Sequence, residues 1–353
     1  MSEAIAKPLR IAQIAPLTGP VAPASTGSIE QLVWLLCEEL TRQDHEVTLF
    51  ATGESETSAA LHSVYRQGYC DDDGLTDWRF HDTMQIAAAC ERADAFDVIH
   101  SHVYSYALPF TRFVQTPIVH TYHIMPDADI VGAYGRYPEA NLTAISRYQR
   151  QNMAEIPDVP VIYNGIDIEA FAFRPVPENY ALFLGQITPS KGPIQAIQVA
   201  RRAGVPLVLA GGADREFYRD EVAPLVDGQS VRYVGRVAAA ERNRLLGGAA
   251  ALIYPLQEPE PFGLVMIEAI ASGTPVAALG VGAVPEIVEN GVSGYHADSV
   301  DALVERMPAV LALDRGRVRQ AAARFDYRVM VECYLALYRR IVARRPAPDM
   351  ARG

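Results

Sequence analysis

The stretch that decides the fold is LRIAQIAP, residues 9–16, an apolar run that leads into a loop rich in Gly, Pro, Ser and Thr. A helical pattern follows over residues 29–40, and a second apolar strand over residues 46–50. Nearly continuous apolar strands joined through a helix are typical of a parallel sheet that is covered on both faces. We expect the apolar runs at 97–102 and 117–121 to extend this sheet.

The same pattern starts again about half a chain later, at YALFLG, residues 180–185. A loop to Lys191, a helical pattern over residues 193–203 and the strand-to-glycine run 206–212 follow it. Two such openings predict an α/β protein of two Rossmann-like domains with a linker near residues 171–177. We expect the ligand in a cleft between these domains, beyond the carboxyl ends of the strands.

Length and composition agree with this organisation. The 353 residues are too many for one ordinary core and suit two α/β domains, and the apolar half of the chain is typical of a globular protein. The net charge of -11 argues against nucleic acid as a partner, because phosphate neutralisation needs clustered Lys and Arg.

The cysteines and the N-terminal residues of the sequence indicate the cellular compartment. Cys37, Cys70, Cys90 and Cys333 lie far apart without a CxxC motif, which favours reduced thiols over a zinc site or a disulfide framework. Residues 1–8 lack the apolar stretch of a signal peptide. We therefore expect a cytoplasmic protein.

The segment with the richest chemistry is EPEPFGLVMIEA, residues 258–269. It places Glu260 in a loop bracketed by prolines and Glu268 two turns into a helix, with seven residues between the two carboxylates. On the exposed face of that helix, Glu268 could accept hydrogen bonds from a ribose diol. Glu260, near a sugar, could accept from its hydroxyls and offset developing positive charge.

A glycine opens the same helix. The amides of Gly263, Leu264 and Val265 are helix-start donors without an intrahelical acceptor, which makes them a natural cradle for a phosphate. Gly263 has no side chain to keep the ligand away.

This segment resembles the E-x7-E signature of the retaining glycosyltransferases of family 4, the glycosyl transferases group 1, which have the GT-B fold. The resemblance implies that Glu268 binds the ribose, Glu260 the transferred sugar and Lys191 the diphosphate. It covers nearly the whole chain and includes the segments 164–167, 182–192, 271–276 and 282–286.

The resemblance also implies a domain plan and a donor. Residues 1–172 would form the acceptor domain, residues 173–326 the nucleotide-sugar donor domain, and residues 327–353 a C-terminal helix that crosses back to the first domain. The donor would be a UDP-sugar, or next a GDP-sugar, and neither a cofactor nor a metal is implied.

Two positions depart from the family pattern. The family usually has Arg directly after Gly185, where this chain has Gln186, so one cation that would hold the diphosphate is missing unless a nearby Arg replaces it. The family usually has two adjacent glycines in the first-domain loop, whereas here Gly27 is followed by Ser28, which could narrow the approach of the acceptor or phosphate. Gly27 is equally well explained as a simple turn into the helix.

Histidines end the expected strand at 97–102. His100 and His102 alternate along it and therefore lie on one face. The resemblance favours His102 as the residue that touches the transferred sugar, and His100 is explained as a packed core histidine. Tyr122 and His123 are candidates on the acceptor side.

No metal site is predicted. Asp127 and Asp129 imitate the DxD motif of metal-dependent transferases, but that class has one domain, and the acidic run 71–73 is more simply a solvated loop. The two histidines of the strand lack further ligands at metal-binding spacing.

The resemblance thus implies a retaining, metal-independent hexosyltransferase that forms an α-glycosidic bond. Front-face attack is the working mechanism, because no nucleophilic carboxylate is apparent. A nucleotide-sugar epimerase or a sugar phosphorylase on the same fold remains an alternative. A non-catalytic sugar-nucleotide binder is another. The sequence identifies neither the acceptor nor the oligomeric state. We expect membrane contact only if the acceptor is a lipid.

Overall fold

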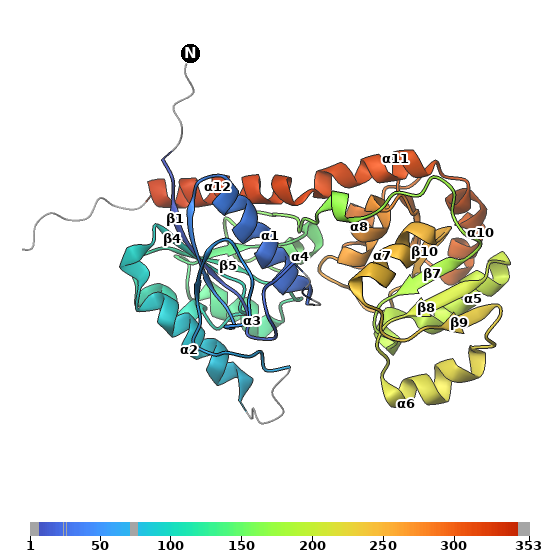
Figure 1. The fold of residues 1–353 in the computed structure, drawn as a ribbon, viewed down its shortest axis with the longest axis horizontal. Coiled ribbons are helices and arrows are strands. Elements are labelled where there is room, and N and C mark those ends of the chain that lie inside the picture. The colour runs from blue at the N-terminus through green and yellow to red at the C-terminus, as the bar shows by residue number, and fades with distance from the viewer. Residues whose placement is uncertain (1–6, 24, 26, 71–76, 345–353) are drawn as a thin grey trace, which may run out of the picture. The chain divides into compact units, whose positions relative to one another are not determined.

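The computed structural model describes residues 7–23, 25, 27–70 and 77–344. They form two compact units, each built on one parallel sheet (Figure 1). The first comprises the described residues up to Ile145, Arg150–Gly165 and those from Tyr327 on, and the second comprises Ser146–Gln149 and Ile166–Asp326.

The first boundary lies before residue 172, which the sequence predicts as the domain end. The amide of Ile166 already donates to the carbonyl of Phe325 (2.9 Å) in the second unit. The 3-10 helix η3 (Ile168–Ala170) packs against helix α8 (Leu264–Ala271) of the same unit. These contacts draw the segment after Gly165 into the second unit.

The first unit has a six-stranded sheet in the order β3-β2-β1-β4-β5-β6, with every neighbouring pair parallel. Its predicted strands are confirmed. The strands are β1 (Arg10–Ile14), β2 (Glu46–Phe50), β3 (Ala60–His62), β4 (Val98–Ser101), β5 (Ile118–Thr121) and β6 (Asn141–Thr143). The helices are α1 (Ser28–Arg42), α2 (Trp78–Cys90), α3 (Ala128–Gly135) and α12 (Tyr327–Ala343), with the 3-10 turns η1 (Ala93–Ala95) and η2 (Leu108–Arg112).

Helices cover both faces of this sheet. On one face, α1 and α12 lie against each other and bury Leu36, Tyr334 and Tyr338 with the strands (Figure 1). On the other, Ile86 of α2 packs with Phe96. The last helix is therefore part of the core of the first unit.

The second unit repeats the topology in the order β12-β11-β10-β7-β8-β9, again all parallel. The strands are β7 (Ala181–Leu184), β8 (Leu207–Ala210), β9 (Val231–Tyr233), β10 (Ala251–Tyr254), β11 (Val276–Leu279) and β12 (Gly294–Ala297). The α-helices, besides α8, are α5 (Pro193–Ala203), α6 (Arg215–Phe217), α7 (Ala239–Gly248), α9 (Val284–Ile287), α10 (Val300–Leu311) and α11 (Arg315–Gln320). Shorter turns are η4 (Pro189–Lys191), η5 (Tyr218–Val222), η6 (Ala223–Leu225) and η7 (Ala321–Phe325), and α4 (Arg147–Gln151) lies where the chain passes between units.

Both sheets reverse their strand order at one place, between β1 and β4 in the first unit and between β7 and β10 in the second. At such a point the loops after the two strands diverge and leave room for a ligand at the carboxyl edge. We therefore expect the site residues to follow these four strands along the chain. Among the described helices, none is long and apolar enough to cross a membrane.

Candidate active site

Two of the predicted donor-site residues meet at the reversal point of the second unit. Lys191 follows β7 and Glu260 follows β10, and the Lys191 ammonium forms an ion pair with Oε1 of Glu260. The side chains keep 27% and 19% of their surface exposed, so they are shielded yet reachable. Burial lowers the pKa of Lys191. The structure thus brings a cation and a carboxylate together at the edge where a ligand is expected.

Glu260 is held from two further sides. The Tyr254 hydroxyl, at the end of β10, donates to Oε2 of Glu260 at 2.5 Å. The Ala283 amide donates to the Glu260 carbonyl at 3.2 Å. Tyr254 is buried, and burial raises the pKa of its hydroxyl, so it stays a donor. The two carboxylate oxygens therefore have separate partners, the Lys191 ammonium and the Tyr254 hydroxyl.

The predicted phosphate cradle starts α8. Gly263 precedes the helix in the left-handed region (φ 99°), where a side chain would be strained, and it offers no side-chain cap. The first-turn amides of Leu264 and Val265 have no intrahelical acceptor. A Cβ at position 263 would lie 2.7 Å from the methyl group of Met266 and 3.7 Å from Oε2 of Glu260. Glycine thus keeps the helix start open beside Glu260.

Glu268 corrects one prediction. The sequence analysis placed it on an exposed face of α8, but its side chain is only 9% exposed and pairs with Arg242 Nη1 at 3.5 Å. Burial raises the pKa of Glu268, and the Arg242 guanidinium opposes that rise. Helix α8 is enclosed by neighbouring elements over most of its length. The carboxylate is therefore held by a cation from α7.

Gln186 stands at the end of β7, exposed, directly after Gly185. The next amide, that of Ile187, donates to the carbonyl of Gly212 after β8 (2.8 Å). A Cβ on Gly212 would lie 3.3 Å from Nη2 of Arg236, which follows β9. Within the described part of the chain, the Arg236 guanidinium has no recorded partner. The Arg236 guanidinium thus lies beside the end of β8, the strand next to β7. The position after Gly185 at the end of β7 is where the family carries its arginine.

In the first unit, Gly27 and Ser28 start α1 after β1. The backbone of Gly27 is extended (φ -79°), so its conformation alone does not require glycine. A Cβ there would overlap the carboxylate of Glu30, which folds back over the helix start. Glu30 is buried, and burial raises its pKa. A side chain at position 27 would therefore require the Glu30 carboxylate to shift, whereas the side chain of Ser28 is exposed.

His100 is a core histidine, as the sequence analysis explained it. It is fully buried, its Nδ1 is 2.6 Å from the Tyr338 hydroxyl and its Nε2 is 2.7 Å from Thr121 Oγ1. Burial lowers its pKa well below the usual range, so the ring is neutral. It ties β4 to α12.

His102 lies at the end of β4 and is only 1% exposed. Its Nε2 is 3.1 Å from Oε1 of Gln13, and its Nδ1 is 3.0 Å from Nε2 of His123. Burial lowers the pKa of His102 well below its usual range and lowers that of His123 to about 4. Both rings are therefore neutral, and both nitrogens of His102 are occupied by protein groups.

This chain of contacts fixes the proton positions. The Gln13 oxygen accepts only, so His102 carries its proton on Nε2 and accepts on Nδ1. His123 then donates from Nε2, which leaves its Nδ1 as an unprotonated acceptor. His123 is half-buried, whereas Tyr122 beside it is only 4% exposed. His123 is thus the outer member of the pair.

Two family models match the chain in succession. The model described as Glycosyltransferase Family 4 matches residues 29–170, and the model described as Glycosyl transferases group 1 matches residues 167–326. The chain belongs to the family 4 glycosyltransferases.

Similar proteins agree with this membership. The D-inositol 3-phosphate glycosyltransferase of Mycobacterium avium (strain 104) is 28% identical, and the alignment covers 95% of each chain. AviGT4, a glycosyltransferase involved in avilamycin A biosynthesis, is 27% identical with a TM-score of 0.74, over 96% of this chain and 99% of that one. HepE of Anabaena, solved in complex with UDP-glucose, is 17% identical with a TM-score of 0.67, over 94% and 100%. The GT-B fold predicted from the sequence is confirmed.

The remaining acidic motifs have structural explanations or lie elsewhere. In this glycosyltransferase Asp127 is the N-cap of α3, with Oδ1 accepting from the Ile130 amide at 2.8 Å. The run 71–73 lies outside the described residues. Among residues that the structure describes, no group of three His, Cys, Asp or Glu side chains could hold a metal ion.

Sequence reasoning missed the residues that support the site, among them Gln13, Tyr254, Arg236 and Arg242. Gln13 carried a signal, since it is a lone amide in the middle of an apolar strand. Tyr254 also ends an otherwise aliphatic strand. Their partners, however, become neighbours only through the fold.

Proposed function

We propose that this glycosyltransferase is a retaining, metal-independent hexosyltransferase that moves a sugar from a nucleotide diphosphate donor to an acceptor hydroxyl, forming an α-glycosidic bond. The observation that carries the proposal is the meeting of Lys191 and Glu260 beside the open start of α8. In one cradle the chain offers a cation and free amides for the diphosphate and a carboxylate for the sugar.

The roles follow from the chemistry of each group. Lys191 and the amides of Gly263 to Val265 take the diphosphate, and Glu260, released from Lys191, accepts from sugar hydroxyls. Glu268 accepts from the ribose, held by Arg242. Gln186 donates hydrogen bonds without charge, and the free guanidinium of Arg236 supplies the positive charge that the family's arginine would bring.

On the acceptor side we place His123 ahead of His102. An unprotonated Nδ1 on His123 is available to accept from a sugar hydroxyl, while both nitrogens of His102 are already engaged. His102 then acts as a positioning residue. The sequence analysis had assigned His102 to the transferred sugar and His123 to the acceptor side.

The donor is proposed as a UDP-sugar, with a GDP-sugar next. HepE, solved with UDP-glucose, supports this choice through the shared fold. Attack from the front face, with the departing phosphate taking the acceptor proton, uses no protein nucleophile. The cytoplasmic location expected from the sequence stays a prediction.

The test combines binding with turnover. UDP, GDP and ADP are titrated by calorimetry, and hydrolysis of the UDP- and GDP-hexoses is followed by nucleotide release. We expect UDP to bind, and Lys191→Ala to weaken its binding at least tenfold and slow release. Arg317→Ala, which removes an exposed cation on α11 in the same unit, is the matched control. Equal effects of the two variants would refute the assignment of Lys191.

The competing functions give other outcomes. A non-catalytic binder, which the exposed Gln186 motivates, would bind a nucleotide tightly with no release against any acceptor. An epimerase or a phosphorylase would convert the sugar without an acceptor hydroxyl. Product analysis with and without an acceptor therefore separates the three.

A further inference from the structure

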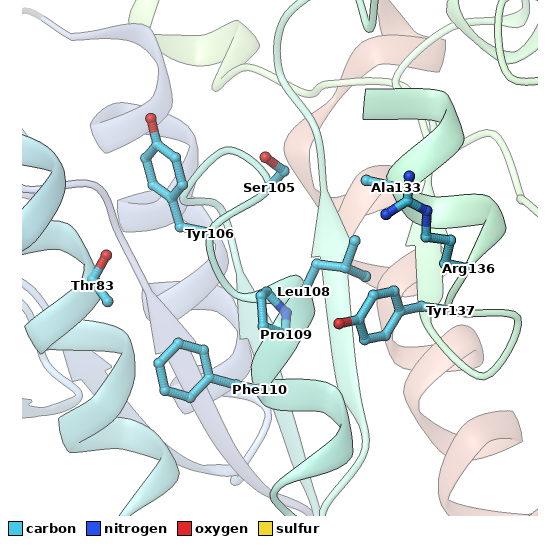
Figure 2. A pocket seen from close by; sticks show the side chains of 9 residues that line it. All are labelled: Thr83, Ser105, Tyr106, Leu108, Pro109, Phe110, Ala133, Arg136 and Tyr137. Carbon is cyan, nitrogen blue, oxygen red and sulfur yellow. The ribbon is translucent and has the colours of Figure 1, made fainter. Parts of the chain in front are cut away.

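A cavity of about 520 Å³ lies in the first unit between α2, η2 and α3. The crossover from β4 to β5 contains only the five-residue turn η2, where a longer helix usually covers the sheet. Figure 2 shows Thr83 on one side, Phe110 and Pro109 below, and Arg136 and Tyr137 on the other side. The short crossover thus leaves a hollow large enough for a small molecule.

Aromatic side chains form part of its walls, and two of them, Tyr106 and Tyr137, contact neighbouring aromatic or cationic side chains. The ring of Tyr106 lies 6.2 Å from that of Trp78 and 5.7 Å from that of Tyr104. The guanidinium of Arg112 lies 4.1 Å from the centre of the Tyr137 ring. These contacts restrict the two tyrosine rings before a ligand arrives, which lowers the entropy cost of binding.

One cation on the rim is left over. Arg112 is bound to Glu139 (2.5 Å) and to the carbonyl of Arg136 (2.6 Å), so the carboxylate nearest in the chain is taken. Arg136 has no recorded partner for its guanidinium within the described ranges, and it lies beside Ala133 at the cavity (Figure 2). In a chain of net charge -11, a free arginine at an aromatic cavity fits an anionic ligand.

The cavity is linked to the histidines of the candidate site. Ser105 and Tyr106 follow His102 along the chain after β4. Leu108, in the lining, belongs to the same apolar cluster as Tyr122, the neighbour of His123. The cavity is therefore built by the segments that leave the carboxyl ends of β4 and β5.

We propose that this cavity binds the anionic, ring-containing part of the acceptor, a sugar that carries a phosphate or a carboxylate. The ring lies against Tyr106 and Tyr137, and Arg136 pairs with the anion. Calling this ligand the acceptor rests on the proposed function, whereas its binding to the cavity does not.

The experiment uses a tryptophan beside the cavity as reporter. The chain has two tryptophans, so Trp34→Phe leaves Trp78, which contacts Tyr106, as the only tryptophan, and its emission is followed with excitation selective for tryptophan. Glucose 6-phosphate, glucuronate, glucose and inorganic phosphate are titrated at millimolar concentration. We expect the two anionic sugars to change the emission saturably, and glucose and phosphate to bind at least tenfold more weakly.

Variants of the full chain then locate the ligand. Arg136→Gln is expected to weaken binding of the anionic sugars at least tenfold, and Tyr137→Leu to weaken it as well. The control Arg340→Gln, an exposed cation on α12, is expected to leave it unchanged. Calorimetry with UDP on the same samples reports separately on the donor site.

Two results would overturn the proposal: no saturable response to either anionic sugar, or equal affinities in Arg136→Gln and Arg340→Gln. If the unmodified chain did not bind UDP, that result would instead count against the proposed function and leave the result for the cavity unaffected.

Discussion

Replacing Tyr254 with phenylalanine should slow sugar transfer while leaving UDP binding nearly unchanged. The Tyr254 hydroxyl donates to Oε2 of Glu260 at 2.5 Å, and the Lys191 ammonium holds the other oxygen. UDP lacks the transferred hexose, so its affinity should depend little on where Oε2 of Glu260 points. A bound hexose does depend on it, because Glu260 is the proposed acceptor for its hydroxyls.

The size of the effect follows from the lost interaction. A hydrogen bond to a charged group contributes about 1.5–3 kcal/mol, and each 1.4 kcal/mol corresponds to about a factor of ten. Tyr254→Phe should therefore lower kcat/KM for the UDP-sugar by about tenfold to a hundredfold. The loss should fall mainly in kcat if Glu260 acts on the developing charge.

The matched control is Tyr180→Phe, which also deletes a buried hydroxyl, one that donates to the Leu245 carbonyl at 2.9 Å away from Glu260. Steady-state kinetics, UDP calorimetry and thermal unfolding are measured for both variants. If Tyr254→Phe lowers kcat/KM no more than Tyr180→Phe does, Tyr254 does not position Glu260 and the reasoning fails.

Three further substitutions test other parts of the structure. Burial raises the pKa of Asp82 to about 6, so its folded-state value exceeds the unfolded one, and its stabilising contribution at acid pH is lost as the pH rises through about 6. Asp82→Asn should remove this loss and raise the free energy of unfolding, measured in urea, by about 3 kcal/mol near pH 8, by about half of that near pH 5 and hardly at all near pH 3.5. An unchanged pH dependence would contradict this expectation. Arg242→Gln should raise the pKa of Glu268 further, because the guanidinium opposes that rise. As the pH is lowered, the variant should therefore lose UDP affinity at a higher pH than the parent does. Calorimetry at several pH values would show the same midpoint in both proteins if the pair were irrelevant. Gln13→Leu removes the acceptor that fixes the histidine chain leading to His123, and we expect kcat about tenfold lower with UDP affinity retained; a normal kcat would exclude a positioning role.

The parts of the fold that the sequence predicted are those with a local cause. Apolar runs such as 9–16 and 180–185 must be covered on both faces, and this requirement leads directly to parallel sheets with helices between the strands. The meeting of Lys191 and Glu260 follows in turn, since the strands before them flank the reversal of strand order.

The face of Glu268 could not be predicted in this way. Helix α8 reads LVMIEAIA, so its apolar residues surround the axis and leave no polar stripe to indicate a solvent-facing side. Its partner Arg242 lies on α7, and strand β10 separates α7 from α8 in the sequence. The spacing of the two residues therefore does not indicate that they pair. The same holds for Gln13 and Tyr338, 325 positions apart and 3.1 Å from each other.

The pair of Lys191 and Glu260 suggests how the donor site distinguishes a sugar nucleotide from the bare nucleotide. When a diphosphate takes over the Lys191 ammonium, Oε1 of Glu260 loses its partner while Oε2 keeps the Tyr254 hydroxyl. A shielded carboxylate with an empty oxygen is costly, and a hydroxyl of the bound sugar removes that cost. In the proposed mechanism, recognition of the diphosphate therefore prepares Glu260 for the hexose, and UDP alone leaves this exchange incomplete.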